Sequence, residues 1–527
     1  MMNQRLLVWA ITCSLAGFIF GFDLMVISGV EQPIQKLWDL SASMHGWAIS
    51  SAIWGTVIGS IFGSIPTNRF GRKKTLIAIG LLYFISALGS ATATGLASFS
   101  FFRIIGGIGV GISTVAAPIF ISEISPAERR GRLTGMFQFN IVFGLLIATL
   151  SNYFIRENVD VESWRWMLGV EAIPALIYSI MCFTLPESPR WLIWKGRHEE
   201  GKSILKTINP GLSETELSEL VSEISNSDTS EKKQKSFDLR KLKLPVALAI
   251  LIAMFNQLSG INAILGFAPR IFGMTGIDTS AGLLNSSLVT LVNLVCTMVG
   301  LRLIDRYGRR TLLYIGSFGY IISLGVCTWA FAHYKAPFRV AAAALDFQAA
   351  SAEVQKTDLS EQKKIKASED FETARLELVE SSNDDTFKGK GIDAPSGLDS
   401  AEYDALSKAA LSDATKQSGA GSTIVLICIL GFIAAHAFGQ GTVIWVFIAE
   451  IFPNQARATG QSIGCGTHWL FAALLIYLFP IAMANFSPAT LFVFFTFMMI
   501  LHLIWVKKMV PETKGLSLEE IESKLKR

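Results

Sequence analysis

The stretch from residue 458 to residue 506 constrains the fold more than any other part of the sequence, because it contains no Asp, Glu, Lys or Arg. As a helix its 49 residues would measure ~74 Å, whereas about 20 residues cross a hydrocarbon core of ~30 Å. The stretch must therefore hold two membrane spans, broken near Asn485 to Pro488. Shorter uncharged runs lie at 133–155, 244–269 and 279–301. We therefore expect a chain that crosses a bilayer many times.

The composition excludes the soluble classes of protein. Only 17% of the residues are charged, against about a quarter in soluble domains, and the mean hydropathy is +0.45. This argues against a soluble enzyme, a nucleic-acid-binding protein and a secreted disulfide scaffold. All six cysteines fall inside apolar runs, where they are typical of small buried hydrophobic residues. We expect no cofactor, no metal site, no enzymatic activity and no nucleic-acid partner.

Uncharged or nearly uncharged runs predict twelve membrane spans. In lipid an open segment satisfies its backbone polar groups only as a helix, so an all-α membrane protein is expected. Alternate connecting loops are rich in Arg and Lys, which places these loops and both termini in the cytoplasm. The predicted spans are 6–29, 47–67, 74–93, 98–121, 132–154, 166–185, 244–271, 280–302, 311–333, 422–449, 458–481 and 489–508.

Two of the connecting segments are long. The cytoplasmic one mixes Lys, Glu and Ser, which predicts short solvated helices. The outer one is acidic, with 10 Lys plus Arg against 16 Asp plus Glu in 337–420. Its composition fits either a helical module or a flexible acidic arm. An outer partner for this insertion, or a role in shading the entry to the cavity, is a further alternative. The expected organisation is a six-helix bundle, a linker, spans seven to nine, the insertion, spans ten to twelve and a tail: 1–186, 187–243, 244–336, 337–421, 422–510 and 511–527.

Three motifs occur twice, in the same order. The pairs are Arg69-Phe-Gly-Arg-Lys with Arg306-Tyr-Gly-Arg-Arg, Ser122-Glu-Ile-Ser-Pro with Ala449-Glu-Ile-Phe-Pro, and Pro186-Glu-Ser-Pro with Pro511-Glu-Thr-Lys. The offset between copies rises from 237 to 327 after the first pair, an increase of 90 that matches the outer insertion. Two copies of a six-helix unit are typical of transporters whose binding site lies between the halves at mid-membrane.

Longer motifs resemble those of the sugar porter family of the major facilitator superfamily, over everything except the insertion. They are Gly21-Phe-Asp23 through Ile27-Ser-Gly29, Arg103 with Gly106, Gly107, Gly109 and Gly111, Pro118 through Arg130-Gly131, Pro186-Glu-Ser-Pro-Arg190-Trp-Leu, Gln257-Leu-Ser-Gly-Ile-Asn262, Asp305-Arg-Tyr-Gly-Arg-Arg310 and Pro511-Glu-Thr-Lys-Gly515. The resemblance implies twelve transmembrane helices in two pseudo-symmetric halves. It further implies a monomeric transporter of a monosaccharide in the inner (plasma) membrane, closest to bacterial xylose and hexose proton symporters.

Asp23 is the only acidic residue in the first span. A charge at membrane depth is costly unless it is paired or protonated, so such a residue is a functional candidate, and Arg103 is its expected partner. The resemblance implies that this pair couples protons to sugar movement. The alternative is a static ion pair that holds two helices together.

A sugar site needs neutral hydrogen-bonding groups and an aromatic face. Span seven supplies three amides within seven residues, at Asn256, Gln257 and Asn262. The resemblance adds further substrate contacts at Gln138, Asn293, Trp445 and His468, of which His468 stands where the family usually has an amide. Packing between helices is the alternative role for a lone amide. For Asn293 the two roles are evenly balanced.

Acidic and basic residues recur at the cytoplasmic ends of the spans in both halves. They resemble the family's network that closes the cytoplasmic side of the transporter. The alternative is that the basic loops only set topology, since a surface pair stabilises by only ~0–1 kcal/mol. The expected network comprises Arg69, Glu123, Arg130, Arg190, Asp305, Arg309, Glu450 and Arg457, with Glu123 and Glu450 each seven residues before an Arg.

Two rival functions remain beside sugar/proton symport. A proton-independent facilitator would share the fold but would only equilibrate its sugar. A sugar sensor would bind without transporting. The monosaccharide and protons are the expected partners of the chain, together with the lipid bilayer.

Overall fold

The computed structural model describes residues 4–126, 130–159, 161–233, 242–356, 361–384, 387–388, 400–453, 456–515 and 520. Helices account for nearly all of these residues, and no strand occurs among them. Eleven helices or joined helix pairs in this described part are long and apolar enough to cross a membrane. A twelfth span is formed by α2 and α3, which are bent by 49° at Gly63. The predicted all-α architecture is thereby confirmed.

The N-terminal half contains six spans. They are α1 (Gln4–Leu37), α2 (Ala42–Phe62) with α3 (Ser64–Phe70), α4 (Arg72–Ala91), α5 (Leu96–Ile124), α6 (Arg130–Asn158), and α7 (Ser163–Gly169) with α8 (Ala172–Cys182). Within this half α1 packs on α6 and α2 packs on α5. Glycine permits the second contact, because a Cβ atom at Gly107 would lie 1.8 Å from the carbonyl oxygen of Ala52.

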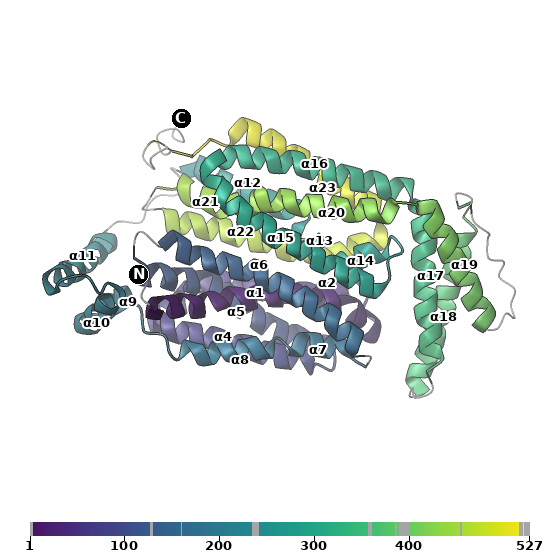
Figure 1. The fold of residues 1–527 in the computed structure, drawn as a ribbon, viewed down its shortest axis with the longest axis horizontal. Coiled ribbons are helices and arrows are strands. Elements are labelled where there is room, and N and C mark those ends of the chain that lie inside the picture. Colours follow the sequence, from purple (N-terminus) through teal and green to yellow (C-terminus); the bar gives the residue numbers. More distant parts are fainter. Residues whose placement is uncertain are drawn as a thin grey trace.

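The C-terminal half repeats the six-span arrangement. Its helices are α12 (Lys243–Leu258) with α13 (Ile261–Gly266) and α14 (Ala268–Gly273), α15 (Thr279–Tyr307), α16 (Arg309–His333), α20 (Gly421–Phe438) with α21 (Gln440–Ile451), α22 (Arg457–Asn485) and α23 (Pro488–Met509). The end of α22 and the start of α23 coincide with the break predicted in the long uncharged stretch. The two halves lie side by side, and they touch where α2 meets α22 and where α6 meets α15 (Figure 1).

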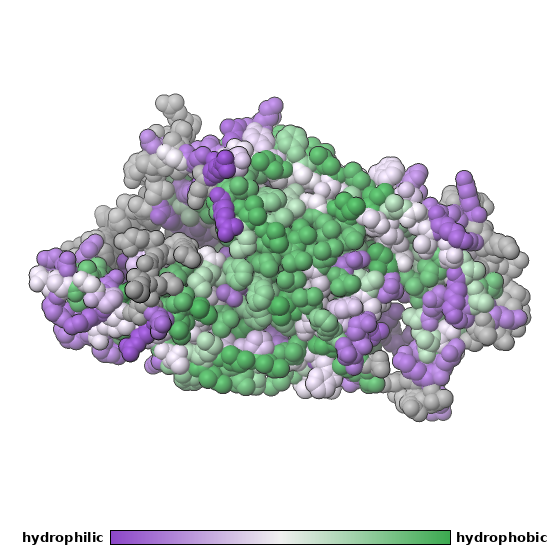
Figure 2. All heavy atoms as spheres, in the orientation of Figure 1, coloured by the Kyte–Doolittle hydropathy of each residue, from purple (hydrophilic) through white to green (hydrophobic). Residues whose placement is uncertain are grey.

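Polar elements cap the two ends of the bundle (Figure 1). One end, the linker end, carries α9 (Pro189–Trp194), α10 (His198–Ile208) and α11 (Glu214–Lys233), and the N-terminus lies there. The opposite end, the module end, carries α17 (Lys335–Val354), α18 (Glu361–Ser382) and α19 (Ser400–Ser418). Figure 2 shows apolar residues gathered over the middle of the molecule and hydrophilic residues at both ends, as a bilayer-spanning protein requires.

The insertion between α16 and α20 is mostly helical where the structure describes it. Helices α17, α18 and α19 share an apolar core of their own, which includes Phe347, Leu378 and Tyr403. This three-helix unit, the module, joins α16 to α20 and therefore belongs in sequence to the C-terminal half. It also reaches the N-terminal half, because Asp346 Oδ1 lies 3.9 Å from Lys36 Nζ at the end of α1.

Candidate functional site

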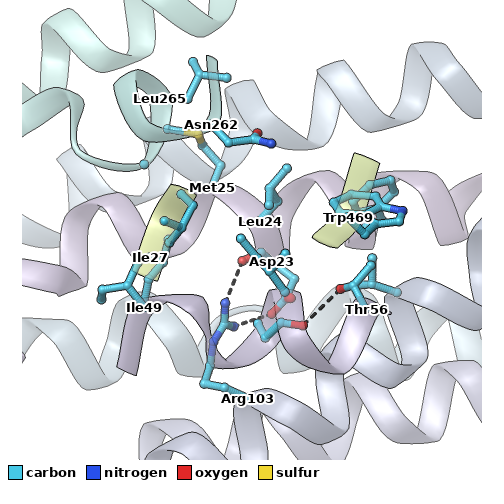
Figure 3. A pocket seen from close by; sticks show the side chains of 16 residues that line it. Asp23, Leu24, Met25, Ile27, Ile49, Thr56, Arg103, Asn262, Leu265 and Trp469 are labelled. Carbon is cyan, nitrogen blue, oxygen red and sulfur yellow. Dashed lines mark hydrogen bonds and ion pairs between the residues drawn. The ribbon is translucent and has the colours of Figure 1, made fainter. Parts of the chain in front are cut away.

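A cavity lies between the two halves, at mid-height of the bundle. Its walls come from α1, α2 and α5 of the N-terminal half and from α13 and α22 of the C-terminal half. Most of the lining is apolar, and its polar side chains are few: Asp23, Thr56, Arg103 and Asn262, with the indole of Trp469. Figure 3 shows Arg103 reaching Asp23 from one side of the cavity, with Asn262 on the opposite side.

The Asp23–Arg103 pair forms the charged wall of this cavity. Arg103 Nη1 donates to Asp23 Oδ1, and Nη2 donates to the Asp23 carbonyl oxygen at 3.1 Å. Both residues are buried, with 2% of each exposed. The guanidinium thus holds both the side chain and the backbone of α1 at this point. Packing of α5 against its neighbours depends on Gly106, whose Cβ would lie 2.3 Å from Ser86 Oγ and 3.8 Å from Asp23 Oδ1.

A second carboxylate, Glu171, lies near this pair and was not predicted. It stands directly before α8 in the N-terminal half, is 1% exposed, and interacts electrostatically with Asp23 and Arg103. Its Oε1 atom has no hydrogen-bond partner among the residues that the structure describes. The signal was present in the sequence, because Glu171 is the only charged residue of the predicted span 166–185. The argument applied to Asp23, a lone acid at membrane depth, applies to Glu171 equally.

A polar cluster stands on the C-terminal side, at the break between α12 and α13. Gly260 allows this break because its φ of 89° suits glycine. Across it, Asn262 Nδ2 donates to Gln257 Oε1 at 2.8 Å, and Gln257 Nε2 donates to Asn256 Oδ1 at 3.1 Å. Gln257 Nε2 also lies 3.1 Å from Nε2 of His468 on α22. Four predicted substrate contacts are therefore joined in one hydrogen-bonded group.

An aromatic wall adjoins the polar cluster. The ring of Trp445 on α21 lies 5.0 Å from the ring of His468, and the ring of Trp469 lies 5.0 Å from it on the following position of α22. Trp469 also packs on Phe20 of α1 with ring centroids 5.8 Å apart, so it bridges the halves. Amides beside indole rings are the combination that a sugar ring and its hydroxyl groups require.

Two predicted substrate contacts do not join this cluster in the described part of the chain. Gln138 is half-buried on α6 and makes no hydrogen bond to the cluster. Asn293 is buried on α15, where its Oδ1 accepts from Thr297 Oγ1 at 3.3 Å. This contact lies within one helix, so both roles weighed for Asn293 remain predictions.

At the linker end each half contains a partly buried arginine–glutamate pair. Arg72 donates to Glu123 through Nε at 2.9 Å and Nη2 at 2.8 Å, and Arg309 donates in the same two-pronged way to Glu450 at 3.1 and 2.7 Å. A further glutamate caps each arginine helix. Glu187 Oε1 accepts from the Arg72 backbone N–H at 2.7 Å, and Glu512 Oε1 accepts from that of Arg309 at 3.0 Å. The repeated motifs thus build equivalent clusters.

These contacts include Glu123, Arg309 and Glu450 of the predicted network. Glu123 pairs with Arg72, which the predicted network did not include, and Arg69 is exposed on the surface. Arg457 does not pair with Glu450, since its buried Nε and Nη2 have no hydrogen-bond partner. Arg190 is exposed on α9. The side chains of Arg130 and Asp305 lie outside the described residues.

Comparisons with known proteins agree with this arrangement. The family model described as "Sugar (and other) transporter" matches residues 9–345 and 406–525. A D-xylose-proton symporter of Escherichia coli is 28% identical, over 97% of this chain and 94% of the symporter. An arabinose-proton symporter of Bacillus subtilis is 30% identical, over 97% of this chain and 94% of its own.

A solved structure matches the fold. It is a partially occluded, inward-open xylose transporter of Escherichia coli, with a TM-score of 0.73 and 26% sequence identity. The match covers 98% of this chain and 100% of the other chain. The helices are therefore arranged as in the major facilitator fold expected from the sequence motifs.

Proposed function

Since the chain belongs to the sugar transporter family, we propose that it is a monosaccharide/proton symporter that works by alternating access. Membership of this family makes the chain an integral membrane transporter and not an enzyme. The main support for proton coupling is the buried ion pair of Asp23 and Arg103 in the wall of the cavity. A passive carrier has no need of a carboxylate at this depth, where its burial is costly.

The proposed coupling uses two states of one carboxylate. While Asp23 is ionised, Arg103 neutralises it, as in the structure. When the halves move and the guanidinium withdraws, desolvation favours the protonated acid, so Asp23 takes up a proton from the side then open to the cavity. Glu171 offers a second buried acceptor beside the same guanidinium. The proton site therefore belongs to the N-terminal half.

The sugar is proposed to bind between this pair and the C-terminal cluster. Gln257, Asn262 and His468 supply donors and acceptors for hydroxyl groups, and Trp445 and Trp469 supply apolar faces. The cluster is uncharged apart from the imidazole, which suits a neutral substrate better than an acidic or basic one. A pentose or hexose is the substrate class that fits, in agreement with the names of the relatives that match.

We propose that the linker end faces the cytoplasm and that the membrane is the inner (plasma) membrane. The basic motifs at Arg69 and Arg306 precede helices that start at the linker end, and positively charged loops are retained in the cytoplasm. Both termini then lie inside, and the module lies outside.

Transport by the purified chain in proteoliposomes tests the proposal. A panel of labelled pentoses and hexoses is offered with an imposed proton gradient, acid on the side that corresponds to the module end. One proton per sugar permits about tenfold accumulation for each pH unit of gradient. Accumulation above equilibrium that a protonophore abolishes is expected. Equilibration without accumulation would indicate a facilitator instead, and binding without uptake would indicate a sensor.

A further inference from the structure

Charged groups join the two halves at one end of the bundle only, among the residues that the structure describes. At the linker end the arginine–glutamate pairs stay within a half, between α4 and α5 or between α16 and α21. At the module end Glu31 of α1 pairs with Arg270 of α14, and these residues belong to different halves. The pair thus spans the seam that must open if the cavity is to face the module end.

The Glu31–Arg270 pair has the geometry of a strong interaction. Arg270 Nε lies 3.0 Å from Glu31 Oε1, and Nη2 lies 2.6 Å from Oε2, so the guanidinium holds both carboxylate oxygens. Gln35, one helical turn further along α1, accepts from the same Nη2 at 2.5 Å. The Glu31 side chain is fully buried, whereas 21% of the Arg270 side chain remains exposed.

A histidine on a third helix fixes the carboxylate. His45 of α2 is fully buried, and its Nε2 lies 3.2 Å from Glu31 Oε2 and 3.1 Å from the Glu31 carbonyl oxygen. Its Nδ1 has no hydrogen-bond partner, and the ring meets Phe267 edge-on with centroids 6.1 Å apart. The described hydrogen-bonding contacts of the His45 ring are therefore all to Glu31, and its position orients that carboxylate towards α14.

We propose that Glu31 and Arg270 form a latch that holds the module end shut, with His45 as the positioning residue. Opening of this end must carry α1 away from α14, so the carboxylate and the guanidinium must separate. Removal of one partner leaves the other buried and unpaired in the closed state. This destabilises the closed state far more than loss of an exposed ion pair would. The latch rests on the proposed function, because only a transporter with alternating access has to open at this end.

Cysteine accessibility in membrane vesicles tests the latch. Ile49→Cys places a reporter on the cavity wall, and a membrane-impermeant maleimide is applied from the module side of vesicles that carry the full chain. Labelling of the chain without the reporter is subtracted, since six native cysteines are present. Glu31→Gln and Arg270→Gln are each expected to raise the labelling rate, by on the order of 100-fold if the full cost of an unpaired charge acts on opening.

Two further variants separate charge from shape. The double variant Glu31→Gln with Arg270→Gln removes both charges, so it is expected to label more slowly than either single variant. Arg270→Lys keeps the charge but loses the two-pronged contact, and an intermediate rate is expected. If the neutral single variants fail to fold, Arg270→Lys still tests the latch. The latch requires the labelling rate of Arg270→Lys to exceed that of the parent.

The chain supplies a matched control at the same end. Lys36 and Asp346 also join α1 to the C-terminal part, but they are 3.9 Å apart, and their side chains are 69% and 61% exposed. Lys36→Gln should therefore leave the labelling rate unchanged. Parental labelling in the Glu31 and Arg270 variants would overturn the latch, as would a rise of equal size in Lys36→Gln.

A measurement of the His45 role completes the test. His45→Gln retains a donor that can reach Glu31, whereas His45→Leu does not, so only the second should speed the labelling. Equal rates in both variants would overturn the positioning role. Sugar uptake is followed in the same vesicles. Absence of uptake in the parent would count against the proposed function, whereas parental labelling in the latch variants of a chain that transports would count against the latch alone.

Discussion

Gln257 is the centre of the proposed sugar site, and its replacement gives the sharpest test of that site. Its side chain joins Asn262 at 2.8 Å, Asn256 at 3.1 Å and His468 at 3.1 Å. Gln257→Ala removes all three contacts. In the free protein, water entering the cavity can replace the lost amide. In the complex the sugar excludes that water, so at least one buried polar group is left without a partner.

The expected loss follows from the cost of one such group. An unsatisfied buried donor or acceptor costs ~1–3 kcal/mol, which corresponds to an increase of about 5- to 150-fold in the sugar Kd. The Kd is measured by isothermal titration of the purified chain with the sugar that the parent transports. Because Asn262 donates directly to Gln257, the double variant Gln257→Ala with Asn262→Ala should lose less than the sum of the single losses.

Asn152 provides the matched control for this experiment. It is a fully buried amide on α6 whose Nδ2 donates to the Val26 carbonyl oxygen at 3.0 Å, within the N-terminal half. Asn152→Ala should lower the thermal stability of the chain and leave the sugar Kd unchanged. A parental Kd for folded Gln257→Ala would refute the reasoning and place the sugar elsewhere. An equal rise in the sugar Kd for Asn152→Ala would show that loss of any buried amide weakens binding by disturbing the fold and not by removing a sugar contact.

Asp23→Asn is expected to abolish proton-driven sugar accumulation while sugar binding and equilibrium exchange persist. Counterflow measurements in proteoliposomes check the exchange. Undiminished accumulation would contradict the coupling role. Replacement of residues 340–418 by a short Gly/Ser linker should leave turnover per folded transporter intact, because the module has its own core and lies outside the bundle. A large loss of turnover at unchanged expression and affinity would show that the module takes part in gating. Gly107→Val should prevent folding, since even a Cβ would lie 1.8 Å from a backbone oxygen within the same half. A Cβ at Gly46 would lie 2.1 Å from the carbonyl oxygen of Tyr477, which belongs to the other half. Gly46→Val should therefore fold and shift the chain towards opening at the module end. Equal losses of expressed, monodisperse protein in the Gly107 and Gly46 variants would count against that distinction.

The arrangement of the spans could be predicted because the bilayer leaves few alternatives. Uncharged runs had to become helices, and the long run 458–506 had to break, which it does between Asn485 and Pro488. The amide cluster was also accessible from the sequence, since Gln257 and Asn262 are five positions apart and flank a glycine with positive φ. Local spacing and the physics of lipid were sufficient for these features.

Contacts between distant segments could not be predicted in this way. Glu123 pairs with Arg72, 51 positions earlier, and Glu31 pairs with Arg270, 239 positions later. No periodicity within one helix encodes such a choice of partner, because it depends on which helices become neighbours. Glu171 is different, since its isolation in an apolar span was visible, and a uniform treatment of buried acids would have included it.

The proposed proton site and most of the proposed sugar contacts lie in different halves. Asp23 and Arg103 sit on α1 and α5 of one half, whereas Gln257, Trp445 and His468 sit on α12, α21 and α22 of the other. If these proposed roles hold, the movement of the halves links the two ligands, because it changes both the cavity around the sugar and the surroundings of the carboxylate. Substitutions in the C-terminal half are then expected to change the sugar preference while the number of protons carried, set in the N-terminal half, is retained.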